Sequence, residues 1–204
     1  MKNILTLIVI LATVGSGYSQ KFHYGFGAGV NYTSLVFNRS DFESPKYKVG
    51  FQINAVVGYS FGEKIGIRLE PGFAKRGTVL SYPGFPDSNI NLDYITLPLL
   101  LQYSPVRNFS ILLGPECSYR ITANAITNGS STDLTSIYDS KFDVGINAEI
   151  AYKVYNKLEL GLRYNRGFIS TIKDLKYTDG YGNDMGKATA CNQGVTLALT
   201  YMIK

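Results

Sequence analysis

Residues 92–120 of the chain, LDYITLPLLLQYSPVRNFSILLGPECSYR, decide its fold class. Two apolar runs flank a short turn at residues 104–108, and the first run is too short to cross a bilayer as a helix, which needs about 20 apolar residues. In the second run, from Phe109 to Thr122, large apolar side chains alternate with small or polar ones. A period of two residues is typical of a β-strand, so the stretch predicts a β-hairpin.

The same alternation continues on both sides of this hairpin. It predicts six further strands, around residues 22–32, 49–61, 65–74, 142–152, 158–168 and 195–203. The connections alternate between a few residues and long segments rich in Ser, Thr, Asn, Asp, Gly and Pro, so all the long ones share one end. We therefore expect an all-β fold, an eight-stranded antiparallel up-and-down transmembrane β-barrel with short periplasmic turns and long extracellular loops.

The two faces of the predicted strands differ strongly. One parity carries Phe, Tyr, Leu and Ile, and the other carries Gly, Ala, Ser and Thr with a few charges. An eight-stranded barrel has an interior just wide enough for side chains, which is too narrow for so many large apolar groups. The apolar parity is therefore expected to face lipid, with aromatic residues gathered near both ends. The alternative is a soluble barrel with an apolar interior.

The composition and the N-terminal segment narrow the classes of protein to which the chain can belong. The chain has 204 residues and a net charge of +5, and its basic residues are scattered, so no nucleic-acid partner is expected. Residues 1–19 predict a cleaved signal peptide, with Lys2, an apolar run and the small residues Gly17 and Ser19 before the cut; the alternative is a retained anchor. Residues 20–204 then form a barrel domain in the cell outer membrane, with outer-membrane lipid around it.

Seven charged residues share the inward parity; four of them fall at similar heights along the barrel, with Glu116 and Arg120 closer to the long connections and Glu159 closer to the short turns. They predict a charge network in the lumen: Arg68, Glu70, Glu116, Arg120, Glu149, Glu159 and Arg163. Folding the hairpins on their turns places Glu149 opposite Arg163 and Asn54 opposite Glu70. Desolvated charges persist only when they are paired. The network could plug the barrel or line a narrow conduction path.

Little in the sequence indicates chemistry. His23 is the only histidine, so a His/Cys metal site or a Ser-His-Asp triad has little support, and we expect no metal site, no cofactor and no enzyme. Aromatic residues in the long connections are candidates for contact with a protein partner: Tyr82, Phe85, Tyr177 and Tyr181. Pro71, Pro98 and Pro115 fall at one height on adjacent strands and predict irregular hydrogen bonding there.

Several stretches resemble a known family. They are FGAGVNY (26–32), RLEPGF (68–73) and LDYITLPLLLQY (92–103), with GPE (114–116) and GLRYN (161–165). The resemblance is to the PorT-like outer-membrane β-barrel domain of Bacteroidetes-type bacteria, and it covers essentially the whole mature chain. It implies an eight-stranded outer-membrane barrel. Name-giving members take part in type IX secretion, whereas most others have no assigned activity.

We therefore expect a monomeric barrel with a structural or interaction role and a plugged lumen. A protein partner would bind through the extracellular loops or the periplasmic rim. Two alternatives stay open, a component of a PorT-type secretion apparatus and a porin-like pore for small solutes.

Overall fold

The computed structural model describes residues 21–37, 45–81, 84, 86–135, 140–170, 172–178 and 184–203. The predicted signal peptide lies outside the described residues. The described strands are β1 (Lys21–Phe37), β2 (Lys46–Ser60), β3 (Ile65–Leu69), β4 (Gly72–Leu80), β5 (Ser88–Val106), β6 (Phe109–Thr127), β7 (Ser130–Asp133), β8 (Phe142–Tyr155), β9 (Leu158–Gly167), β10 (Ile172–Thr178) and β11 (Asp184–Met202).

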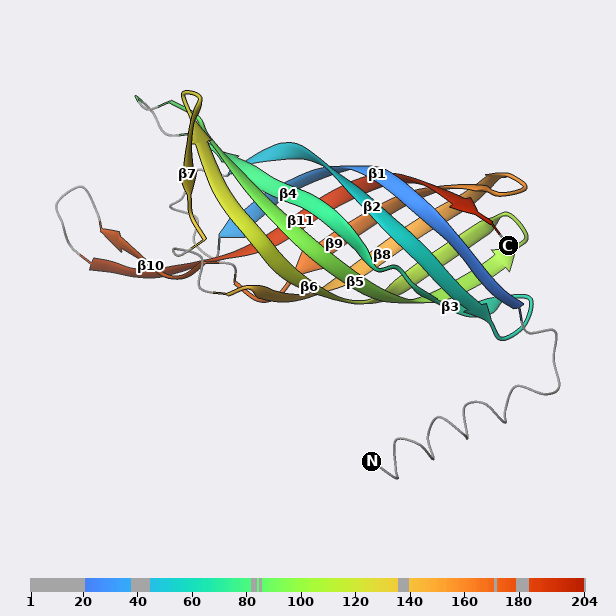
Figure 1. Ribbon diagram of the computed structural model, residues 1–204. Coiled ribbons are helices and arrows are strands. Elements are labelled where there is room, and N and C mark those ends of the chain that lie inside the picture. The colour runs from blue at the N-terminus through green and yellow to red at the C-terminus, as the bar shows by residue number, and fades with distance from the viewer. Residues whose placement is uncertain are drawn as a thin grey trace, which may run out of the picture.

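Eight strand positions close into a ring of antiparallel neighbours (Figure 1). Around the ring, β1 is followed by β2, by β3 and β4 in one position, and then by β5, β6, β8, β9 and β11. Pairing of β11 with β1 completes the closure. The predicted eight-stranded antiparallel barrel is confirmed. No helix in the described segments is long and apolar enough to cross a membrane.

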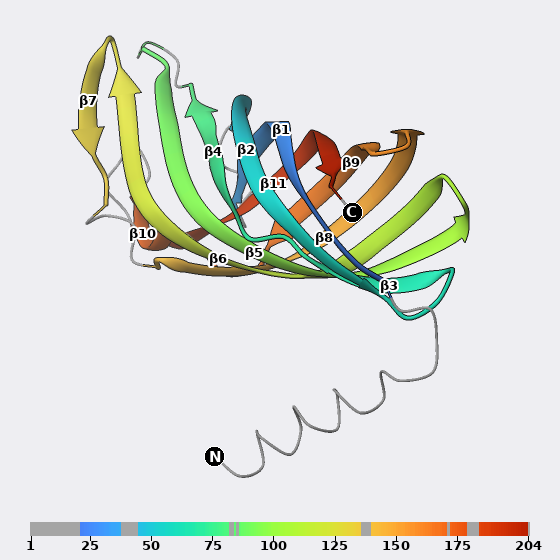
Figure 2. The same cartoon turned by 45° about the vertical axis from the view of Figure 1, so that its right-hand side comes forward.

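Two strands lie outside the ring. β7 pairs only with the far end of β6, and β10 pairs only with β11. Both project beyond the barrel at the end that carries the long connections, which Figure 2 shows clearly for β7. The two long connections that follow the predicted strands at residues 109–122 and 158–168 therefore contain hairpin extensions of the wall.

The large apolar side chains of the wall point outward. Val49 is 66% exposed, Leu101 56% and Leu162 46%, whereas the alternate residues Leu100 and Leu112 are fully buried. The soluble alternative, with the apolar parity inside, is wrong for the described strands. Lipid is the surrounding in which such a surface is stable.

The ladders near the prolines are interrupted in part, as predicted, whereas the β6–β8 ladder runs unbroken through Pro115 and Pro98 still pairs with Glu116. β3 ends before Pro71 and β4 begins after it, and the β5–β6 ladder lacks two residue pairs between Pro98 and Leu101. The register stays the same across both gaps, so the missing proline donors leave gaps rather than bulges. Carbonyls near the gaps still accept: the amide of Ala55 donates to Pro71 at 2.9 Å and that of Glu70 to Pro98 at 3.1 Å.

One predicted pairing is wrong. Asn54 lies opposite Gly72, not Glu70, because four residues separate β2 from β3 and the amide of Phe61 bonds to the carbonyl of Ile65. The register is shifted by two residues from the expected one, so the alternation of faces is unchanged. The side chain of Asn54 still reaches diagonally to Glu70, with 3.4 Å between Nδ2 and Oε2.

Candidate functional site

The lumen holds a concentration of buried charge. Four arginines and five acidic residues of the described chain are less than 10% exposed: Arg68, Arg76, Arg120, Arg163, Glu70, Glu116, Asp143, Glu149 and Glu159. All seven residues predicted for the lumen are among them. Their contacts form layers along the barrel.

The first layer, the transverse cluster, is a chain of five charges. Arg68 contacts Glu159 through Nη1 at 2.5 Å and Glu70 through Nη2 at 2.7 Å. Arg163 contacts Glu70 through Nη2 at 2.5 Å and donates from Nε to Glu149 at 2.6 Å. Because β3 and β9 stand opposite each other in the ring, this chain crosses the lumen from wall to wall.

Local register positions the transverse cluster. Glu149 lies directly opposite Arg163 in the β8–β9 pairing, which confirms the predicted pair. Gly161 provides the space beside them, since a Cβ at that position would lie 2.4 Å from Oε1 of Glu149. A side chain at Gly161 would therefore displace the carboxylate.

The second layer centres on Glu116. Its Oε1 contacts Nη2 of Arg76 at 2.7 Å and accepts from the hydroxyl of Ser118 at 2.8 Å. Its Oε2 accepts from Nδ2 of Asn147 at 2.8 Å, and Asn147 in turn accepts from Asn165 at 2.7 Å. Both carboxylate oxygens are thus held by donors from other strands of the ring.

Arg76 was missed by the sequence prediction, which ended the third strand near Ala74. The signal was present, because Arg76 continues the inward parity of Ala74, and β4 extends to Leu80. Asp143 was missed as well, although it has the inward parity of its strand. Arg76 was missed because the end of its strand was placed too early, whereas Asp143 already lay within the strand predicted at residues 142–152.

The third layer consists of hydrogen bonds that cross the lumen between neutral and charged side chains. Nδ2 of Asn192 on β11 donates to the Tyr94 hydroxyl at 3.0 Å and to Asp143 at 3.1 Å. Strands β5 and β11 are opposite in the ring, so this contact also spans the lumen. Arg120 is 1% exposed and lies opposite Tyr94 in the β5–β6 register.

An apolar cluster lies toward the long connections. This apolar cap consists of Leu35, Ile90, Leu92, Tyr94, Ala123, Ala125 and Ala190. A smaller apolar cluster, Leu100, Leu112 and Ala151, lies beside the transverse cluster, since Leu100 pairs with Arg68 and Leu112 with Glu149 in the sheet. The charged layers are therefore flanked by apolar side chains, and water competes poorly for them there.

The four aromatic residues predicted for a partner surface are not placed. Tyr82, Phe85 and Tyr181 lie outside the described residues, and Tyr177 is described only as backbone of β10. Their role stays a prediction.

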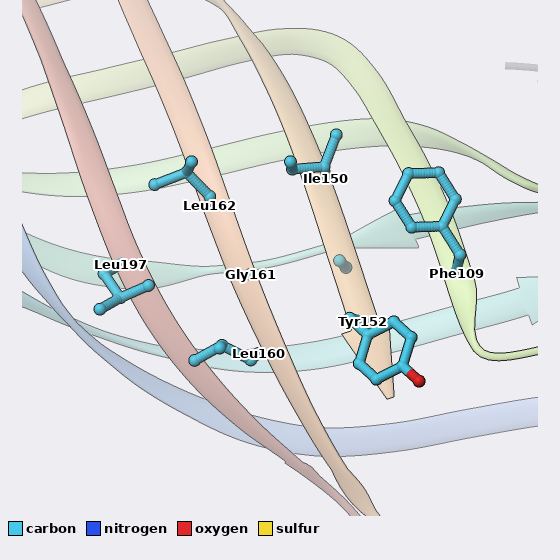
Figure 3. Close-up of a pocket in the computed structure, with 8 residues that line it drawn as sticks. Phe109, Ile150, Tyr152, Leu160, Gly161, Leu162 and Leu197 are labelled. Carbon is cyan, nitrogen blue, oxygen red and sulfur yellow. The ribbon is translucent and has the colours of Figure 1, made fainter. Parts of the chain in front are cut away.

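The surface hollows are outside the lumen. One depression of about 180 Å³ is lined by Phe109, Ile150, Ala151, Tyr152, Leu160, Gly161, Leu162 and Leu197, most of them lipid-facing (Figure 3). A second of about 300 Å³ lies beside it over β6, β8, β9 and β11. Their walls are almost entirely apolar, so they offer contact for acyl chains and no reactive group.

Comparison with known proteins agrees with this architecture. A family model described as outer membrane protein beta-barrel domain matches residues 18–173. The structure of Ail, the attachment invasion locus protein of Yersinia pestis, superposes with a TM-score of 0.53 at 12% identity, covering 90% of this chain and 99% of Ail. Neisserial surface protein A has a TM-score of 0.51 at 13% identity, with 90% and 98% covered. No curated protein matches the sequence.

Proposed function

The chain belongs to the family of outer membrane protein beta-barrel domains, and on that premise we propose a structural or interaction role for a barrel closed by its own side chains. The transverse cluster carries this proposal, because it joins opposite walls of the ring. Its five charged groups, from Glu159 to Glu149, are all less than 10% exposed.

A conducting path would have to break several contacts in series. The transverse cluster, the layer around Glu116 and the apolar cap lie one after another along the lumen. Removing one partner of a buried ion pair costs about 3–5 kcal/mol, so spontaneous opening of all layers is rare. An eight-stranded barrel also has little interior space beyond its side chains.

Conductance tests the closed lumen directly. We expect the purified barrel, inserted into a planar bilayer, to give no discrete single-channel steps, because its charges are paired with one another and not with mobile ions. A known porin inserted into the same bilayer is the positive control. Reproducible steps from the wild-type chain would replace the plug with the small-solute pore.

The proposed orientation follows the general plan of these barrels. The short turns and both ends of the barrel domain face the periplasm, and the long connections face outward. A cleaved signal peptide at residues 1–19 would bring the chain to this compartment, and we infer a monomer because closure of β11 onto β1 leaves no unpaired edge in the ring.

The projecting hairpins support an interaction role. All four residues of β7, Ser130–Asp133, are exposed, and the strand stands clear of the ring (Figure 2). Such an extension presents backbone and short polar side chains to a protein partner outside the cell. The candidate aromatic residues Tyr82, Phe85, Tyr177 and Tyr181 belong to connections that the sequence predicts at that end of the barrel. The periplasmic rim is the other candidate surface.

The PorT-type alternative has its support in the sequence resemblance alone. We expect a deletion strain to secrete type IX cargo at wild-type levels, because the plugged barrel offers no passage for a polypeptide. Cargo in the medium, measured with a known secretion-deficient strain as control, checks this. Loss of secretion that the intact gene restores would instead assign the chain to the secretion apparatus.

A further inference from the structure

A run of polar side chains crosses the outer surface near the long connections. Nη1 of Arg166 on β9 donates to Oε1 of Gln193 on β11 at 2.9 Å. Nε2 of Gln193 donates to the hydroxyl of Tyr47 on β2 at 2.8 Å. The ring of Tyr47 stacks on that of Tyr32 on β1, with centroids 4.8 Å apart and planes at 16°. We call these four residues the outer polar belt.

The outer polar belt stands at the edge of the apolar band. The outward residues of β11 below Gln193 are apolar or aromatic: Val195, Leu197, Leu199, Tyr201 and Ile203. Ten residues separate Ile203 from Gln193, about 33 Å along the strand and about 25 Å along the barrel axis at a tilt of about 40°. That height equals the apolar band of such barrels, so the belt meets lipid headgroups.

Arg166 differs from the other outward-facing cation of the described wall. Lys75 has an acidic partner, since its Nζ lies 3.9 Å from Asp93, whose other oxygen accepts from Thr122. Within the described ranges, no carboxylate lies within 4.0 Å of the Arg166 guanidinium, and its one recorded bond goes to a neutral amide. A charge at the membrane edge is costly unless it finds a partner.

We propose that the outer polar belt binds the phosphate group of a lipid headgroup in the leaflet at the long-connection end. The planar guanidinium of Arg166 has donors beyond the one used on Gln193, and their fork geometry matches phosphate. The hydrogen bond that Arg166 donates to Gln193 holds the guanidinium in place along the wall. The stacked rings of Tyr32 and Tyr47 provide an aromatic surface at the interface, against which the rest of the lipid can pack. The site depends on the bilayer around the barrel and not on a closed lumen.

Binding of a defined phospholipid tests the site. The folded barrel in neutral detergent is titrated with phosphatidate and with diacylglycerol of the same acyl chains, which lacks the phosphate, and bound lipid is counted by native mass spectrometry. We expect the wild type to bind phosphatidate at least tenfold more tightly than Arg166→Gln does, and diacylglycerol equally in both. Lys75→Gln, the matched loss of an outward cation, should stay within twofold of the wild type.

Two further measurements identify the source of the phosphate and keep the test valid if Arg166→Gln does not fold. Inorganic phosphate at 100-fold excess should not displace phosphatidate, and displacement would indicate a free-phosphate site instead. Arg166→Lys keeps the charge without the fork and should give an intermediate loss of threefold or more, even if Arg166→Gln does not fold. Equal binding of phosphatidate by wild type and both variants, or an equal loss in Lys75→Gln, would overturn the proposal.

Discussion

Replacing Arg163 with methionine is expected to lower the free energy of unfolding by about 3–5 kcal/mol. The guanidinium of Arg163 contacts both Glu70 and Glu149 inside the lumen. Without it, two buried carboxylates lose their shared cation, and methionine fills the volume without replacing the charge. The loss comes from the carboxylates left behind rather than from the net strength of the ion pairs.

Urea unfolding of the barrel in lipid vesicles, followed by the mobility difference between folded and unfolded chain on gels, measures this loss. Arg107→Met is the matched control, because Arg107 lies exposed in the β5–β6 turn, and its change should stay within about 0.5 kcal/mol. Adding Glu70→Gln and Glu149→Gln to the Arg163 variant should recover part of the stability, since no unpaired charge then remains. Equal stability of the Arg163 and Arg107 variants would show that the transverse cluster holds nothing together.

Leu162→Arg is the second large effect that we expect, a loss of about 2–4 kcal/mol in a bilayer. Leu162 is outward-facing and 46% exposed, midway along β9. On a soluble protein, an arginine at so exposed a position would change stability by at most about 0.5 kcal/mol. In lipid, the same guanidinium must leave water or thin the bilayer around it.

Tyr155→Arg provides the depth control. Tyr155 is 70% exposed at the end of β8, beside the short turn, where an arginine reaches the interface at a cost of about 0–1 kcal/mol. Both variants are refolded into vesicles of one lipid and unfolded in urea. If Leu162→Arg and Tyr155→Arg cost the same, the middle of β9 does not face the hydrocarbon.

Local pattern was sufficient for much of the fold. Alternation along each strand predicted the strands and which face meets lipid, because a pleated strand turns successive side chains to opposite faces. The Glu149–Arg163 pair was predictable because only two residues join β8 and β9 and both members of the pair must face the lumen; a bulge between Lys153 and Tyr155 shifts the register by one residue from that of the turn itself. The longer turn before β3 admits more than one register, and there the predicted partner of Asn54 was wrong.

The contacts within the candidate site were harder to predict from local sequence pattern. The sequence indicated that Arg68, Glu70 and Arg163 point inward, but not which groups each would contact. Arg76 shows the difficulty, since its place in the lumen depends on how far β4 continues past the expected loop boundary. Its partner Glu116 lies on a strand that is not its neighbour in the ring.

The sequence by itself thus determined the strand pattern, the lipid-facing surface and seven of the nine buried charged residues of the lumen, because these depend on neighbours along the chain. Only the tertiary structure decided that Arg163 meets Glu70, 93 residues away, and that Asn192 meets Tyr94. Those contacts arise when β11 closes onto β1, because closure and strand tilt together set which inward residues share one height across the lumen.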